Sequence, residues 1–146
     1  MSLPNDLLEL FTSEYNKLEN LVNAINFDAE LSVNQIVEVY YQITNLSSMI
    51  TVMRQQHDQT SDTILLEKIL NTEKFISDKF NSDIHGKIII YITNSISNIT
   101  NNLQSLTSEP KSTKTIENEA KLYEKLREMM STKEFVKQYD SRLSND

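Results

Sequence analysis

The chain has 146 residues, enough for one domain with a buried core, and a formal net charge of −7. It contains no cysteine, one glycine and two prolines. Disulfides and thiolate chemistry are therefore excluded, and the many tight turns of an all-β fold are disfavoured. We predict an all-α fold, an antiparallel bundle of four to five helices with long heptad seams, whose core is formed by residues 1–108.

The charge is distributed unevenly along the chain. Residues 1–110 hold 6 basic and 14 acidic residues, a net charge of −8, whereas residues 111–146 hold 8 and 7, a net charge of +1. Nucleic-acid binding needs clustered cations, so we expect no nucleic-acid partner. No stretch is apolar enough for a transmembrane helix, so we expect no membrane insertion. The lack of cysteine and of an apolar signal segment favours an intracellular protein, cytoplasmic by default.

The first predicted helix covers about residues 4–26. Its apolar residues recur at alternating steps of three and four, which predicts a helix that packs lengthwise against others. These residues are Leu8, Phe11, Tyr15, Leu18, Val22 and Ile25. Glu9, Glu14 and Glu19 are spaced by five, and we assign them to the solvent-facing side.

The second predicted helix covers about residues 32–56. Ser32 and Gln35 match a capping box at its start. Its seam consists of Ile36, Val39, Ile43, Leu46, Ile50 and Met53. Glu38 is the only charged residue between Leu31 and Met53, so we expect this helix to be deeply buried or to lie in an interface.

The third and fourth predicted helices cover about residues 62–82 and 87–106. Residues 81–86 are the expected break, with Gly86 in a left-handed C-cap position. The alternative is one long helix, because apolar residues also step by four through the break: Phe80, Ile84, Ile88, Ile92 and Ile96.

No residue between Ile88 and Ser108 is charged. The fourth helix has a heptad seam of Ile89, Ile92, Ile96, Ile99, Leu103 and Leu106. The positions between them are mostly Asn, Ser and Thr, which are mediocre helix formers, so packing rather than propensity must hold the helix. We therefore expect most of its circumference to contact other protein.

Residues 109–115 form the predicted linker, and a charged C-terminal helix follows at about residues 116–143. This helix is either part of the same domain or a docking arm. Its apolar positions are Ile116, Tyr123, Leu126, Met130, Val136 and Tyr139. Ser131 and Glu134 match a second capping box, which predicts a kink or restart there.

Signals for catalysis or metal binding are weak. Neither His57 nor His85 follows a glutamate three positions earlier, so the ligand pattern of carboxylate-bridged metal bundles is missing. Glycine-rich phosphate loops and nucleophile motifs are also missing. His57 with Asp58 and Asp62 is a remote candidate metal site. We therefore predict no enzyme, no cofactor and no catalytic residue.

The sequence favours a non-enzymatic helical interaction or scaffold protein, a subunit of a homo- or hetero-oligomeric assembly. Its expected partner is protein, either a second copy or another helical subunit. The candidate interaction residues are Ile89, Ile92, Ile96, Ile99, Leu103, Val39, Ile43, Ile50, Tyr123, Leu126 and Met130. The alternative is a self-contained four-helix adaptor that binds a partner through its C-terminal helix. A metal- or ligand-binding bundle is the remote alternative.

Overall fold

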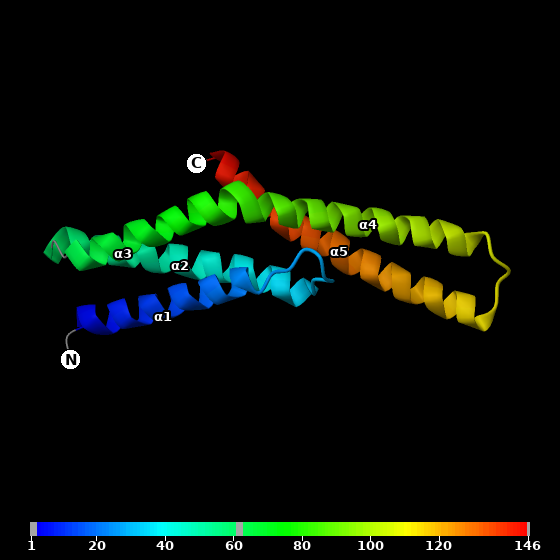
Figure 1. Ribbon diagram of the computed structural model, residues 1–146, viewed down its shortest axis with the longest axis horizontal. Coiled ribbons are helices and arrows are strands. Elements are labelled where there is room, and N and C mark those ends of the chain that lie inside the picture. The colour runs from blue at the N-terminus through cyan, green and yellow to red at the C-terminus, as the bar shows by residue number, and fades with distance from the viewer. Residues whose placement is uncertain (1–2, 61–62, 146) are drawn as a thin grey trace. The chain divides into compact units, whose positions relative to one another are not determined.

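The computed structural model describes the backbone of residues 3–60 and 63–145, and the side chains of residues 6–55 and 63–143. The helical segments are α1 (Leu3–Asn23), α2 (Val33–Thr60), α3 (Thr63–Lys74), the π-helical η1 (Phe75–Ile84), α4 (His85–Thr107) and α5 (Thr113–Asn145) (Figure 1). No strand occurs in these described ranges, which confirms the predicted all-α class. The chain divides into two compact units, Met1–Gly86 (unit 1) and Lys87–Asp146 (unit 2).

In unit 1, α1, α2 and α3 pack side by side, and each helix runs opposite to the one before it (Figure 1). The seams expected for the first two helices form its core. Side chains no more than 7% exposed include Phe11, Leu18, Val22, Ile36, Val39, Ile43, Leu46, Ile50 and Met53. Burying a large apolar side chain contributes about 1.5–3 kcal/mol, so these seams supply much of the stability of unit 1.

Ser32 caps α2 as the sequence predicts. The backbone N–H of Gln35 donates to Ser32 Oγ at 3.1 Å. The Gln35 side chain does not return to the cap. Its Nε2 donates instead to the carbonyl oxygen of Ala24 at 3.3 Å, just after the end of α1. The capping pattern therefore also ties the start of α2 to the end of α1.

The helix does not break between α3 and α4. It is helical without interruption from Thr63 to Thr107, and η1 occupies residues 75–84. A π-helix closes i→i+5 hydrogen bonds and has more residues per turn than an α-helix. The buried or partly buried side chains in this region are spaced by four or five residues. They are Thr72, Ile76, Phe80 and His85. The wider turn keeps them on one side of the helix.

The prediction of a break with Gly86 at a left-handed cap was wrong, and the single long helix is observed. Gly86 lies in the first turn of α4, where an added Cβ would meet no atom within 4 Å. One glycine lowers helix propensity but does not end a helix whose flanking turns are held by packing.

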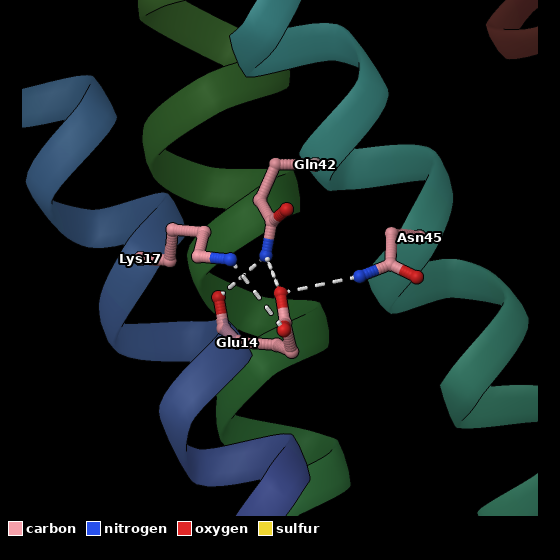
Figure 2. A network of polar contacts seen from close by, with 4 residues as sticks. All are labelled: Glu14, Lys17, Gln42 and Asn45. Carbon is pink, nitrogen blue, oxygen red and sulfur yellow. Dashed lines mark hydrogen bonds and ion pairs between the residues drawn. The ribbon is translucent and has the colours of Figure 1, made fainter.

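Glu14 is the centre of a polar network between α1 and α2 (Figure 2). Gln42 Nε2 donates to Glu14 Oε2 at 2.6 Å and to the Glu14 carbonyl oxygen at 2.8 Å. Asn45 Nδ2 donates to the same Oε2 at 3.3 Å, and Lys17 Nζ lies 3.6 Å from Oε1. The Glu14 side chain is only 17% exposed. Assigning Glu14 to the solvent-facing side was therefore wrong.

In unit 2, α4 and α5 run side by side in opposite directions, joined by a loop at residues 108–112 (Figure 1). Ser112 caps α5, since the Thr115 N–H donates to Ser112 Oγ at 3.2 Å and the Ile116 N–H to the Ser112 carbonyl at 3.0 Å. α5 therefore begins three residues earlier than predicted.

The Ser131–Glu134 pattern does not interrupt α5, contrary to the expected kink or restart. Thr132 lies inside the helix, and its Oγ1 donates to the carbonyl oxygen of Glu128 at 2.7 Å. A threonine hydroxyl satisfied in this way does not require a helix terminus.

Candidate interaction surface

The structure separates the predicted interaction residues into core and surface positions. Val39, Ile43 and Ile50 of α2 are buried in unit 1, so their side chains expose almost no surface to a partner. On α4, Ile92 and Leu103 are buried, whereas Ile89, Ile96 and Ile99 are partly exposed. On α5, Leu126 is partly exposed, and Tyr123 and Met130 are 52% and 54% exposed.

Tyr123 and Met130 belong to an exposed apolar row on α5. Ile116, Tyr123 and Met130 are spaced by seven and are each more than half exposed. Residues seven apart lie almost above one another on a helix, so the three side chains form one stripe. We call it the α5 row.

A second row on α5 faces inward, and each of its residues comes one position before a residue of the α5 row or before Lys137. Thr115, Met129 and Val136 are buried, with Leu122 partly buried between them. Two apolar heptad rows therefore run next to each other on α5, at positions such as Met129 and Met130. Only one of them is buried in the chain, and the other lies open on the surface.

A hollow of about 160 Å³ lies between α4 and α5 within unit 2. Its lining residues are Ile89, Ile92, Lys133, Val136, Lys137 and Asp140, and we call it the α4–α5 groove. Three of these side chains are apolar. The long stems of the two lysines cover apolar surface while their charged ends reach solvent. The groove is therefore a mainly apolar depression that is also lined by two basic residues and one acidic residue.

Two wider depressions are more polar. One, of about 470 Å³, lies between α4 and α5 and includes Asn102, Ser105, Lys121 and Lys125. The other, of about 310 Å³, lies between α2 and the α3–η1 helix and includes Arg54 and Glu73. Arg54 and Glu73 form an ion pair, so each of the two charges has a partner within the chain. Neither depression combines a deep apolar floor with convergent reactive groups.

The helices α2 and α4, which carry few charged residues, each expose one side to solvent. Asn94, Asn98 and Asn101 are exposed along α4. Several hydroxyls nearby are satisfied by their own helix: Thr100 Oγ1 donates to the Ile96 carbonyl at 2.8 Å and Ser105 Oγ to the Asn101 carbonyl at 3.2 Å. In the described structure, α4 is thus not enclosed around its circumference.

Among the polar contacts that the sequence did not predict, two join buried or partly buried side chains of different helices. One is the Glu14–Gln42 network, and the other is a buried hydrogen bond of 2.7 Å between Tyr40 Oη and His85 Nδ1. The signal for the first was available, because Gln42 stands directly beside the apolar seam at Ile43. No local pattern links Tyr40 to His85, because 45 residues separate them.

Among the described side chains, no group of three or more His, Asp and Glu residues is arranged to hold a metal ion. The side chains of His57, Asp58 and Asp62 lie outside those described. Burial raises the pKa of Tyr15 above 10.0, and the nearby charge of Glu19 and a hydrogen bond to it raise it further. A tyrosine with a raised pKa is a poorer base or nucleophile near neutral pH.

In the described part of the chain, every helix is too short or too polar to cross a membrane. Comparison of the chain with protein-family models, with curated proteins and with solved structures found no match in any of the three. The α5 row and the α4–α5 groove are therefore the features on which a functional proposal must rest.

Proposed function

We propose that this chain is a non-enzymatic subunit of a helical protein assembly, and that unit 2 provides a contact surface for a partner protein. The observation that carries this proposal is the α5 row, Ile116, Tyr123 and Met130, with each side chain more than half exposed. Single exposed apolar residues are common on protein surfaces. A straight row at heptad spacing is less common and supplies one of the two apolar positions of the heptad seam by which helices associate.

The residue types of the row support a protein contact. Tyrosine and methionine are enriched at the centres of protein interfaces, where lysine and glutamate are depleted. A methionine side chain also adapts its shape to a partner. Tyr123 and Met130 occupy the middle of α5 and stand beside the buried row of the same helix.

The sparsely charged helices α2 and α4 give additional support. Tyr41, Val52 and Ile90 are large exposed apolar residues on these helices, 63%, 48% and 61% exposed. Exposed positions between them carry amides and hydroxyls, which a partner surface desolvates at a lower cost than ammonium or carboxylate groups. These faces are candidates for further contacts in the same assembly.

An adaptor that uses α5 as a separate arm is less well supported. Both depressions that involve α5 are lined by α4 residues as well, for example Ile89 and Asn102. α4 and α5 also belong to the same compact unit. A surface built by both helices is therefore a better candidate than a freely projecting helix.

Light scattering of the full chain over a wide dilution series tests the proposal. A concentration-dependent oligomer that Tyr123→Ser and Met130→Ser weaken would identify a second copy as a partner. A stable monomer would direct the search to a different helical subunit. A chain that stays monomeric and binds no added helix would contradict the proposal.

A further inference from the structure

We propose that the long helix from Thr63 to Thr107 contains a hinge at Gly86, about which unit 2 changes its direction relative to unit 1. The hinge is a conformational device that is independent of the proposed function. Three features of the structure coincide there: the end of the π-helical η1, the chain's one glycine, and the boundary between the two compact units.

The boundary between the two units lies inside a helix. Unit 1 ends at Gly86 and unit 2 begins at Lys87, yet the backbone is helical on both sides of that junction. Compact units of one chain are usually joined by an exposed linker, and they move relative to one another unless a large apolar interface holds them. All residues around this junction are described, and none of them forms a loop. A change in the direction of unit 2 therefore requires the helix itself to bend.

The helix has little side-chain restraint at Gly86. This residue is exposed, and a Cβ added to it would meet no atom within 4 Å. Glycine adopts a wider range of φ and ψ angles than other residues and favours the helix less. Sharp kinks in helices are found at proline, at glycine and at π-helical turns. Gly86 lies two residues after the end of η1, so two of these three causes meet in one turn.

The backbone hydrogen bonding changes at the same turn. The His85 N–H donates to the Phe80 carbonyl oxygen, an i→i−5 bond of the π type. In an α-helix, such as the one that follows, each N–H bonds four residues back. Where the step changes from five to four, one carbonyl is left out of the series. A bend at this junction therefore interrupts a ladder that is already irregular, whereas a bend within α4 would break regular i→i−4 bonds.

Packed side chains hold the helix on both sides of Gly86. Before it, Phe80 and His85 are 0% and 4% exposed, and His85 Nδ1 lies 2.7 Å from Tyr40 Oη in their hydrogen bond. After it, Ile88 is 0% exposed. Gly86 is exposed between these two segments. We therefore expect the bend at Gly86 rather than in either packed segment.

The hinge would redirect the α5 row without changing it. α5 belongs to unit 2, so Ile116, Tyr123 and Met130 keep their spacing when the whole unit changes direction. The direction in which this surface faces is then set by one turn of a different helix.

The test measures distances between spin labels on the full chain by double electron–electron resonance. The chain contains no cysteine, so introduced cysteines are the only labelling sites. The pair Asn20→Cys with Asn101→Cys connects the two units. The pairs Asn20→Cys with Ser48→Cys, and Asn101→Cys with Glu124→Cys, lie within one unit each, and all four positions are exposed. Dilution with unlabelled chain ensures that only distances within one molecule contribute.

We expect the distance distribution of the connecting pair to be about twice as wide as that of either internal pair, because only the connecting pair registers the hinge. Gly86→Ala should narrow it, since alanine favours the helix, and Lys87→Gly should widen it. Asn98→Ala brings a similar change in helix propensity to another exposed position of α4. It is the matched control and should leave the width unchanged. Circular dichroism verifies that every variant remains helical.

Equal widths for the three pairs would overturn the inference. A wide distribution that Gly86→Ala leaves unchanged would also overturn it, because the motion would then lie elsewhere in the chain. Equal narrowing by Gly86→Ala and Asn98→Ala would do the same, since the effect would not be specific to Gly86. None of these results depends on whether the chain forms an oligomer, so the proposed function is tested separately by light scattering.

Discussion

Tyr40 and His85 are joined by a buried hydrogen bond of 2.7 Å between Oη and Nδ1. The two side chains are 2% and 4% exposed. The Phe80 ring packs edge-on against the Tyr40 ring, with centroids 5.3 Å apart and an interplanar angle of 79°. α2 is thereby connected to the end of η1 and the first residue of α4 by a polar contact in an aromatic environment.

Tyr40→Phe should lower the free energy of unfolding by about 1–3 kcal/mol, because it removes one partner of a buried hydrogen bond. Urea denaturation followed by circular dichroism measures the change. Tyr41→Phe is the matched control, since its side chain is 63% exposed, and it should stay within about 0.5 kcal/mol of the parent chain. Equal losses in the two variants would show that the hydroxyl of Tyr40 is not specially placed.

Gln42→Ala should cost about 1.5–3 kcal/mol, because the amide donates to the Glu14 carboxylate and to its backbone carbonyl. Gln55→Ala, at an exposed position on the same helix, should change stability by less than about 0.5 kcal/mol. Chemical denaturation of both variants provides the comparison. If Gln42→Ala were as mild as its control, the network in Figure 2 would contribute little.

Ile92→Asp should destabilise the chain by about 3 kcal/mol or more, because it places a carboxylate at a position that is 1% exposed. Ile90→Asp, two residues earlier and 61% exposed, should cost less than about 0.5–1 kcal/mol, mostly through helix propensity. Thermal unfolding of the pair measures the difference. A reversed order would mean that the buried face of α4 is misassigned.

Gly86→Ala should stabilise the chain by about 0.5–1 kcal/mol, because alanine favours the helix and its Cβ would meet no neighbour within 4 Å. The measured quantity is the urea midpoint. Destabilisation would instead indicate a backbone conformation that only glycine adopts, as at the break that the sequence suggested.

The pKa of Tyr15 is raised by burial, then by the charge of Glu19 and its hydrogen bond. The folded pKa therefore exceeds the unfolded value of 10.0, so the protonated phenol adds stability that is fully present below pH 10. That contribution is lost as the pH rises through the folded pKa. The unfolding free energy of Tyr15→Phe should decline less over this alkaline range than that of the parent chain. Parallel declines in denaturation at increasing pH would contradict the raised pKa.

The sequence predicted correctly that the chain is helical and which residues of α1 and α2 form the core. Each of these two helices has one unbroken heptad seam, so only one of its faces is apolar enough to be buried. The sequence could not select the buried face of α5. Leu122 and Tyr123, and Met129 and Met130, are adjacent apolar pairs, so two rows one residue apart fit the same periodicity. Contact with α4 decides between them, and periodicity within α5 contains no information about that contact.

The candidate surface was only partly predictable for a related reason. Tyr123 and Met130 were expected as interaction residues, and they lie on the surface. Val39 and Ile43 were expected as well, yet they belong to the core of unit 1. An apolar seam has the same appearance in sequence whether it faces the chain's own helices or another protein. Exposure in the folded chain is what separates the two cases.

The π-helical turns of η1 restrict how the chain can change in length. Deleting one of residues 81–84 would shift His85 by one position relative to Phe80, so its imidazole would no longer meet both Tyr40 and Phe80. Substitutions that preserve the residue count avoid this shift. The exposed loop at residues 108–112 sets no comparable spacing, and loops of this kind accept insertions at a small entropic cost. Insertions and deletions should therefore accumulate in that loop and be rare in η1.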